Sequence, residues 1–317
     1  MASAPMPRLC EVAASEVFQR LNGPGLDLCV GALNVRVHSN VRSLADQVQA
    51  AYGQFPASHR APWIDLHLNV VLRRQLHRWW KPQVDLWHDG RLLFEPFPAE
   101  AALPLLEWGM NWLIARTRND LLLLHAAVVE RQGFAMVMPA LPGSGKSTLS
   151  AALGLSGWRL MSDEFGALDL GERRFRAVLK PAALKNESIG VIRSFAPERA
   201  RFGPSFPGTR KGTVAHLAAS ADAVDRVHET AAPGCVLMPR WKAGSPTTIE
   251  PVAPTMTFSK LAFNAFNYAV TGAAGFEAVA HISRSVKAWQ LVYGDLDDAI
   301  RELDVRWPGL IEPPTGV

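Results

Sequence analysis

The sequence predicts an α/β fold, and three observations lead to this prediction. Residues 134–138 (F-A-M-V-M) are a short apolar strand candidate, a glycine-rich turn follows, and residues 147–155 suit a helix. Strand-like alternation and helix-like spacing are interleaved on both sides of this unit. The chain has 317 residues, enough for two domains. We therefore expect an α+β N-terminal module at 1–117 and a second module, containing the glycine-rich turn, at 118–317.

The first module reads as a mixture of strands and helices in chain order. Its strand candidates alternate apolar and polar residues, and its helix candidates carry apolar residues three or four positions apart. Asp89-Gly90 is a dipeptide typical of tight hairpin turns. The expected elements are a strand pair at 26–37, a helix at 41–52, a strand at 63–72, a hairpin of 84–87 with 91–95, and a helix at 99–115.

The second module begins with a strand pair and continues through the glycine-rich turn. A segment at 195–211 is rich in Pro, Gly and Arg without a regular period, so we expect a loop there. The other expected elements are strands at 121–130, 134–138, 160–163, 167–170 and 175–178, and helices at 147–155, 258–270, 276–291 and 294–303.

Composition limits the class of protein. The formal net charge is +4 and three cysteines are scattered, so neither a disulfide framework nor a metal-binding cysteine spacing is present. No secretory signal or membrane-spanning stretch is visible, and we expect a cytoplasmic protein with no membrane partner. Residues 73–81 mix basic and aromatic side chains, a pattern that suits nucleic acid. One short patch on a nearly neutral module is more typical of a strand rim or a protein surface, so we expect no nucleic acid partner.

Residues 140–148 read A-L-P-G-S-G-K-S-T, a Walker A phosphate loop with alanine in place of its first glycine. Glycine lets the backbone approach a phosphate closely, and the following helix directs its positive end to the same group. A Walker A lysine reaches the β- and γ-phosphates, and the next hydroxyl binds Mg²⁺. The alternative is a glycine-rich turn with a surface lysine. The expected nucleotide contacts are Gly143, Ser144, Gly145, Lys146, Ser147 and Thr148, with Ser147 also a metal ligand.

Two adjacent acids, Asp163 and Glu164, end the strand L-M-S-D-E, 17 and 18 residues after Lys146. Phosphoryl transfer needs Mg²⁺ on the β- and γ-oxygens and a carboxylate that accepts the proton of the attacking hydroxyl. Two acids beside a phosphate loop are suited to dividing these roles. The alternative is that the two acids lie in a solvent-exposed turn.

Two further candidates lie on either side of the loop in sequence. His125 lies in an apolar strand, where it is either satisfied by a backbone carbonyl or faces the γ-phosphate or Asp163. Residues 209–216 form a basic segment, and Arg210 within it suits a developing phosphoryl charge. The alternative for this segment is a solvated basic loop.

Residues 124–192 resemble the catalytic domain of HPr kinase/phosphorylase, and more closely the HprK-related kinases. L-H-A-A-V-V is similar to the family's strand motif M-H-G-V, and L-M-S-D-E matches its acid pair in place and spacing. The resemblance implies a P-loop domain with the mixed sheet that this family shares with phosphoenolpyruvate carboxykinases. It also implies that Asp163 activates the hydroxyl, that Glu164 binds Mg²⁺, and that His125 interacts with the catalytic acid.

The resemblance weakens at residues 184–192, where L-K-N-E-S-I-G-V-I stands for the family's L-E-x-R-G-x-G-I-I. Lys185 falls where the family has a metal-binding glutamate, and Glu187 follows two residues later. Either Glu187 replaces that glutamate as a metal ligand, or the site uses Lys185 differently. The N-terminal module does not resemble the family's N-terminal domain, and we expect it to select the substrate or assemble an oligomer.

The sequence as a whole therefore predicts a kinase that uses ATP and Mg²⁺. The expected catalytic residues are Asp163, His125, Lys146 and Arg210, and the expected metal ligands are Ser147, Glu164 and Glu187. The expected partner is a peptide or small protein with a Ser or Thr acceptor, and we expect a homo-oligomer. Two alternatives stay open at this point: a kinase of a small molecule, and a non-catalytic module that senses nucleotide and holds a peptide.

Overall fold

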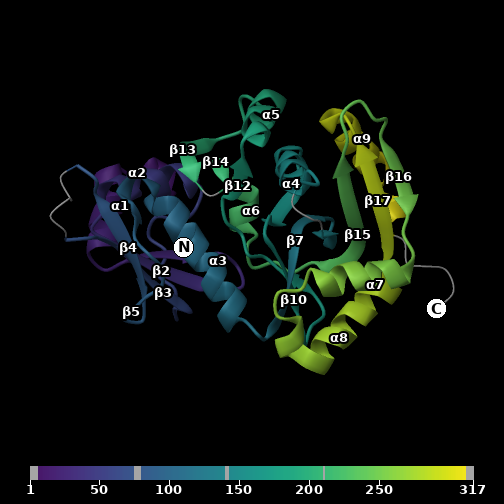
Figure 1. Cartoon of the computed structure of the whole chain (residues 1–317), viewed down its shortest axis with the longest axis horizontal. Helices are drawn as coiled ribbons and strands as arrows, with labels where there is room; N and C mark the ends of the chain where they lie inside the picture. Colours follow the sequence, from purple (N-terminus) through teal and green to yellow (C-terminus); the bar gives the residue numbers. More distant parts are fainter. Residues whose placement is uncertain (1–5, 75–79, 140–142, 210, 312–317) are drawn as a thin grey trace, which may run out of the picture.

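The computed structural model describes residues 6–74, 80–139, 143–209 and 211–311, and every structural statement below concerns these residues. Three residues at the start of the phosphate loop, Arg210, and part of the basic and aromatic segment at 73–81 lie outside them. The described chain is an α/β protein with mixed sheets and helices (Figure 1). The division into domains at residue 117 stays a prediction.

The first part of the chain forms a sheet in the order β1-β2-β3-β4-β5, with β6 beside β4. Strands β2 and β3 are parallel and the other pairs are antiparallel. Asp89 and Gly90 both have positive φ, which confirms the hairpin turn between β4 and β5. The elements are η1 Leu9–Glu11, α1 Ala14–Asn22, β1 Leu26–Cys29, β2 Asn34–Ser39, α2 Arg42–Ala51, β3 Leu66–Leu72, β4 Gln83–His88, β5 Arg91–Leu92, β6 Phe97–Pro98, η3 Ala99–Ala101 and α3 Ala102–Thr117.

A larger mixed sheet follows, in the order β11-β10-β7-β8-β15-β17-β16, with β9 beside β7. β15 runs parallel to both β8 and β17, while β7 is antiparallel to β8, β9 and β10. Helix α4 packs on β7 and β9, and α8 packs on β7 and β17. The elements are β7 Leu121–Arg131, β8 Phe134–Pro139, α4 Lys146–Leu155, β9 Arg159–Ser162, β10 Phe165–Asp169, β11 Phe175–Arg176, β15 Ala232–Trp241, β16 Thr248–Pro251, α7 Pro254–Phe263, α8 Tyr268–Ser285, β17 Lys287–Tyr293 and α9 Leu296–Leu310.

A small antiparallel sheet, β12-β14-β13, lies between these two parts (Figure 1). β13 contacts α2 of the first part, and β12 contacts α4 of the second. The sheet therefore connects the N-terminal helices to the helix that follows the phosphate loop. Its elements, with the helices beside it, are β12 Ala182–Lys185, α5 Glu187–Phe195, β13 Phe202–Thr209, β14 Gly212–Leu217 and α6 Ala221–Asp225.

Three predicted elements are wrong. The segment at 195–211 is not a loop throughout, because residues 202–209 pair with β14 as strand β13. The predicted helix at 276–291 ends at Ser285, and residues 287–293 form β17 in the middle of the large sheet. The helix expected at 258–270 is also interrupted, because the amide of Phe266 bonds to the carbonyl of Leu123 on β7 at 2.8 Å.

Among the described residues, no helix is long and apolar enough to cross a membrane.

Candidate active site

The phosphate-loop residues lie at the start of α4, directly after β8. Gly143 and Gly145 have φ of 84° and 89°, which glycine adopts without strain, and Lys146 begins the helix. The loop is held from the neighbouring strands: the amide of Trp241 donates to the carbonyl of Ser144 at 3.0 Å, and the Tyr293 hydroxyl donates to the carbonyl of Gly145 at 3.3 Å. The described part of the loop therefore rests against the ends of β15 and β17.

Lys146 is buried and joins α4 to the acid pair. Its Nζ donates to the backbone carbonyl of Asp163 at 2.8 Å. Burial lowers the pKa of Lys146, and the negative charges of Asp163 and Glu164 oppose this shift. The structure thus brings the predicted lysine and the predicted acids together, although they are 17 residues apart in sequence.

Asp163 and Glu164 occupy the turn between β9 and β10. Ser162 Oγ accepts hydrogen bonds from the amides of Glu164 and Phe165, at 3.3 and 3.0 Å, and so fixes this turn. The Asp163 carboxylate is buried and accepts one hydrogen bond, from the amide of Ala183 at 3.1 Å. Ala183 lies on β12, so the small sheet closes over the acid.

The pKa values of the Asp163 and Glu164 carboxyl groups are shifted in opposite directions. Burial and the neighbouring charge of Glu164 raise the pKa of Asp163. Burial alone would raise the pKa of Glu164 as well, but the positive charges of Lys146, His125, Lys180 and Lys211 lower it. A pair of acids with pKa values moved apart is suited to two roles, because the raised one accepts protons better and the lowered one stays ionised.

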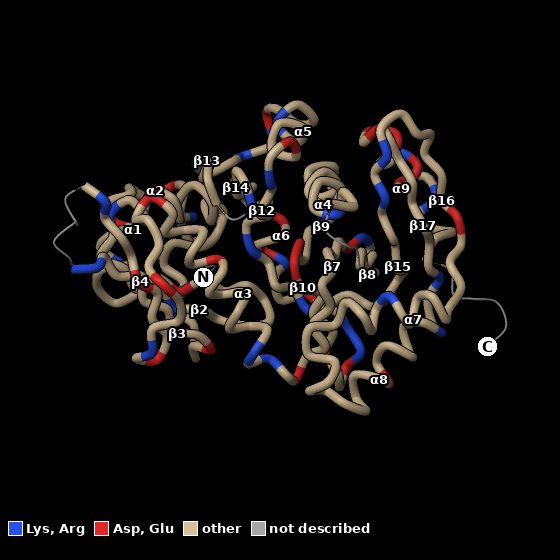
Figure 2. Tube along the Cα trace, viewed as in Figure 1, with Lys and Arg blue, Asp and Glu red and all other residues tan. Residues whose placement is uncertain are grey.

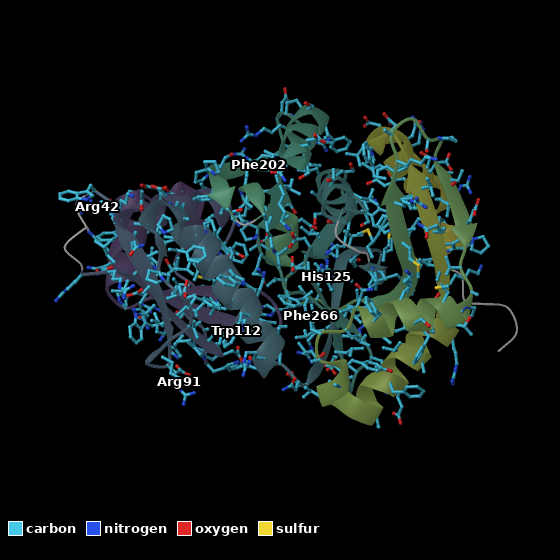
Figure 3. The ribbon with its side chains drawn as sticks, in the orientation of Figure 1. Arg42, Arg91, Trp112, His125, Phe202 and Phe266 are labelled. Atoms are coloured by element: carbon cyan, nitrogen blue, oxygen red, sulfur yellow. The ribbon has the colours of Figure 1, made fainter. Side chains whose placement is uncertain are left out.

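His125 lies on β7 opposite Phe165 of β10. Its ring stacks on Phe266, with centroids 5.4 Å apart and an interplanar angle of 19° (Figure 3). Burial and the charge of Lys146 lower the pKa of His125, and Glu164 is the acid that acts against this shift. Its backbone amide donates to the carbonyl of Asn264 at 2.6 Å. The ring therefore lies beside an aromatic side chain, and the charges of Lys146 and Glu164 influence its pKa.

Basic residues approach the acid pair from the small sheet. Lys185 ends β12, and Lys211 lies in the turn between β13 and β14. The positive charges of both lysines help to lower the pKa of His125. Basic and acidic segments accordingly gather around β10 and β12 (Figure 2). The loop expected at 195–211 includes Lys211, but residues 202–209 of it form β13, and β14 begins directly after it at Gly212. Arg210 lies outside the described residues.

Glu187 is exposed in the first turn of α5. Lys185 is half-buried, and its positive charge helps to lower the pKa of Lys146. The predicted metal role of Glu187 stays a prediction. Within the described ranges, no three His, Cys, Asp or Glu side chains gather into a metal site. Mg²⁺ commonly binds through one or two carboxylates together with water and substrate phosphates, so Ser147 and Glu164 are a donor set of the kind that it uses.

Sequence reasoning missed Trp241, Tyr293 and Lys180. Trp241 and Tyr293 end strands that were not predicted, and Lys180 has no motif around it. The proximity of Lys146 and the acid pair in the sequence gave the signal for those residues, whereas these three reach the site only through tertiary packing.

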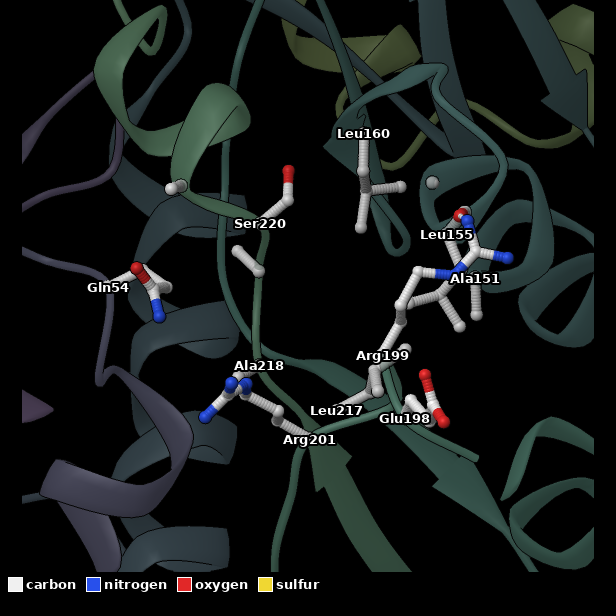
Figure 4. Close-up of a pocket in the computed structure, with 13 residues that line it drawn as sticks. Gln54, Ala151, Leu155, Leu160, Glu198, Arg199, Arg201, Leu217, Ala218 and Ser220 are labelled. Atoms are coloured by element: carbon white, nitrogen blue, oxygen red, sulfur yellow. Dashed lines mark hydrogen bonds between the residues drawn. The ribbon is translucent and has the colours of Figure 1, made fainter. Parts of the chain in front are cut away.

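A separate cavity of about 320 Å³ lies beside the C-terminal end of α4 (Figure 4). Leu155, Leu160 and Leu217 form its apolar wall, and Arg199 and Arg201 lie at its edge. Arg199 already donates to the carbonyl of Leu155 at 2.6 Å. The cavity is distinct from the phosphate loop, which lies at the opposite end of the same helix.

The sequence matches no protein-family model and no curated protein.

Proposed function

We propose that this protein is a kinase that uses ATP and Mg²⁺ and transfers the γ-phosphoryl group to a Ser or Thr hydroxyl of a peptide or small protein. The observation that carries the proposal is the contact of Lys146 with Asp163, which joins a glycine-rich loop at a helix start to a pair of acids. The proposal includes a P-loop domain of the HPr kinase type. The β8–loop–α4 unit in a mixed sheet and the resemblance of residues 124–192 support it.

The loop would bind the triphosphate through its backbone. Amides from Gly143 to Thr148 and the positive end of α4 favour an anion at this point. The Lys146 ammonium has three N–H donors and uses one on the carbonyl of Asp163, so it can also donate to phosphate oxygens. The surrounding Lys185 and Lys211 add positive charge, which suits a polyanionic ligand.

Ser147 and Glu164 would hold Mg²⁺, which neutralises charge on the β- and γ-phosphate oxygens. Ser147 lies in the first turn of α4, and the lowered pKa of Glu164 keeps its carboxylate ionised. Glu187 is a candidate further ligand of the same ion.

Asp163 would accept the proton of the attacking hydroxyl. As the hydroxyl oxygen forms its bond to the γ-phosphorus, the bond from that phosphorus to the β–γ bridging oxygen breaks, and ADP leaves with that electron pair. The raised pKa of Asp163 suits a proton acceptor. His125, stacked on Phe266, would help to orient the acid pair, and Arg210 with Lys211 would stabilise charge on the transferred group.

The test follows γ-labelled ATP in the presence of Mg²⁺ and a library of Ser/Thr-containing peptides. We expect label on peptide with the wild-type protein. Asp163→Asn should keep ATP affinity within about twofold by calorimetry and lose at least about 100-fold in transfer, as expected for loss of a general base. The control Asp297→Asn changes an exposed acid in α9 and should transfer normally.

Three results would contradict the proposal. Label on a metabolite instead of a peptide would indicate a small-molecule kinase, and ATP binding without any transfer would indicate a nucleotide-sensing module. Full activity of Asp163→Asn would remove Asp163 as the base.

A further inference from the structure

Lys180 is a buried lysine in the segment before β12. Its Nζ forms an ion pair of 2.9 Å with Glu107 Oε2, and both side chains are less than 10% exposed. Glu107 belongs to α3 and lies among its apolar residues, whereas Lys180 follows β11. Burying a charge is costly unless the charge is paired, so Lys180 and Glu107 each depend on the other at this junction between the two parts of the chain.

The other oxygen of Glu107 is also occupied. The hydroxyl of Tyr52, which caps the C-terminus of α2, donates to Glu107 Oε1. Tyr52 is fully buried. The carboxylate is therefore held between a phenol from the N-terminal helices and an ammonium from the segment that leads to β12, and these contacts fix the position of Lys180.

The segment that carries Lys180 also contacts the acid pair. Lys180 is three residues before Ala183, whose amide is the hydrogen-bond donor to the Asp163 carboxylate. The positive charge of Lys180 opposes the rise in the pKa of Asp163 and helps to lower the pKa of Glu164. The side chain of this short segment is thus anchored to Glu107, and its backbone binds Asp163.

We propose that Lys180 is a positioning residue for phosphoryl transfer: its ammonium, fixed by Glu107 and Tyr52, anchors the segment whose Ala183 amide binds Asp163, and so keeps the Asp163 carboxylate where the acceptor hydroxyl must donate its proton. The inference rests on the proposed kinase function. A general base must lie within hydrogen-bond reach of the proton that it takes, and a shift of about 1 Å can reduce the rate about 100-fold. The Ala183 amide can hold the Asp163 carboxylate in such a position only while its own segment is fixed, and the ion pair of Lys180 with Glu107 fixes that segment.

The experiment separates positioning from a merely structural role. Lys180→Met leaves Glu107 buried and unpaired, so it should lower the melting temperature. The double variant Lys180→Met/Glu107→Gln removes both charges, and Gln still accepts from Tyr52, so stability should recover. A structural role predicts that turnover recovers with stability. Positioning predicts that kcat stays at least about tenfold below wild type, while the Kd and KM for ATP change less than about twofold. Lys260→Met, in an exposed residue of α7, is the matched control.

A stable double variant with wild-type kcat would overturn the inference while leaving the kinase function intact. Absence of transfer by the wild-type protein would instead overturn the kinase function. If the double variant fails to fold, Tyr52→Phe decides, because it removes only one hydroxyl. A fall of about fivefold in kcat with unchanged ATP affinity supports positioning, and unchanged kcat overturns it.

Discussion

At the scale of single residues, the phosphate loop depends on how closely its backbone approaches the neighbouring strands. A Cβ at Gly145 would lie 2.6 Å from the Tyr293 hydroxyl and 3.1 Å from Trp241 Cβ, and Gly145 has a positive φ. Gly143 also has a positive φ, but a Cβ there would meet no atom of the described residues within 4 Å. The two glycines therefore differ in the room available for a Cβ atom and not in backbone strain.

We predict that Gly145→Ala reduces ATP affinity far more than Gly143→Ala. Both variants carry the strain of a positive φ, which costs about 1 kcal/mol, but only the first must also move the loop away from Tyr293. Calorimetric titration with ATP and Mg²⁺ measures the difference, which we expect to be at least about tenfold in Kd. Equal losses in the two variants would mean that the contact with Tyr293 does not shape the loop.

Whether a residue of the candidate site could be predicted depends on how far along the chain it lies from the elements that place it in the site. The spacing of Lys146, Asp163 and Glu164 predicted their proximity, because a strand, a loop and a helix in sequence place them at one edge of a sheet. Lys180 and Tyr293 were not predictable in this way. Their approach depends on β12 and β17, whose pairing involves partners far away in sequence.

At the scale of elements, local sequence patterns predicted those strands and helices that pack or pair with elements adjacent in sequence. The hairpins at Asp89-Gly90 and Gln132-Gly133 have positive φ at both turn residues. Their strands agree with the expected ranges to within one residue at each end, except that β5 ends at Leu92 and not at residue 95. β17 was mistaken for helix because its apolar residues continue the spacing of α8, and its pairing with β15 and β16 makes it a strand. β13 was mistaken for a loop because it contains Gly and Pro and pairs with β14 through two register shifts.

The hairpin of β13 and β14 offers a test of how this element serves the site. A Cβ at Gly212 would lie 2.3 Å from Asn186 Oδ1, which accepts the amide of Thr213 at 3.0 Å. Asn186 precedes α5 and follows Lys185, so a shift there would displace the hairpin turn and the end of β12 together.

We predict that Gly212→Ala lowers stability by about 1–3 kcal/mol and reduces phosphoryl transfer, since the clash breaks a hydrogen bond and moves Lys211. Gly208→Ala is the matched control, because Gly208 also has a positive φ but, within the described part of the chain, no atom lies within 4 Å of its Cβ position. Chemical denaturation and transfer assays on both variants measure the difference. Transfer by Gly212→Ala at the level of Gly208→Ala would argue against a role of the hairpin in catalysis.

At the scale of the whole molecule, backbone contacts as well as the Lys180 cluster join the two parts of the chain. The amide of Ala32 donates to the carbonyl of Ala177, and that of Leu179 donates to the carbonyl of Val30, each at 2.8 Å. The segment from 177 to 180 thus contacts the loop between β1 and β2 by its backbone and α3 by its lysine. The sequence predicted two modules, but it carried no local signal for this junction, because every contact in it joins distant segments.

A second buried charge cluster ties the large sheet to α6. Glu130 of β7 bonds to Arg159 Nε at 2.6 Å and to Arg226 at 3.1 Å, and it also accepts the amide of Gly133 at 2.6 Å. Burial alone would raise the pKa of Glu130, but the hydrogen bonds from Arg159 and Gly133 and the charges of the two arginines lower it. A carboxylate whose native pKa is lowered stabilises the fold above its unfolded pKa of about 4.3, and this contribution is lost as the pH falls through the native value.

We predict that Glu130→Gln destabilises the protein by about 3 kcal/mol at pH 7, because it leaves the buried Arg159 without its charge partner. The difference from wild type should shrink as the pH is lowered from 5 to 3, since Glu130 of the unfolded chain binds a proton below about pH 4.3, before the native carboxylate with its lowered pKa does. Urea unfolding across this pH range measures it, with Glu302→Gln as the control in an exposed ion pair, where about 0–1 kcal/mol is expected. A difference that stays constant down to pH 3 would show that the arginines do not depend on the charge of Glu130, and that the cluster holds the sheet to α6 by hydrogen bonding alone.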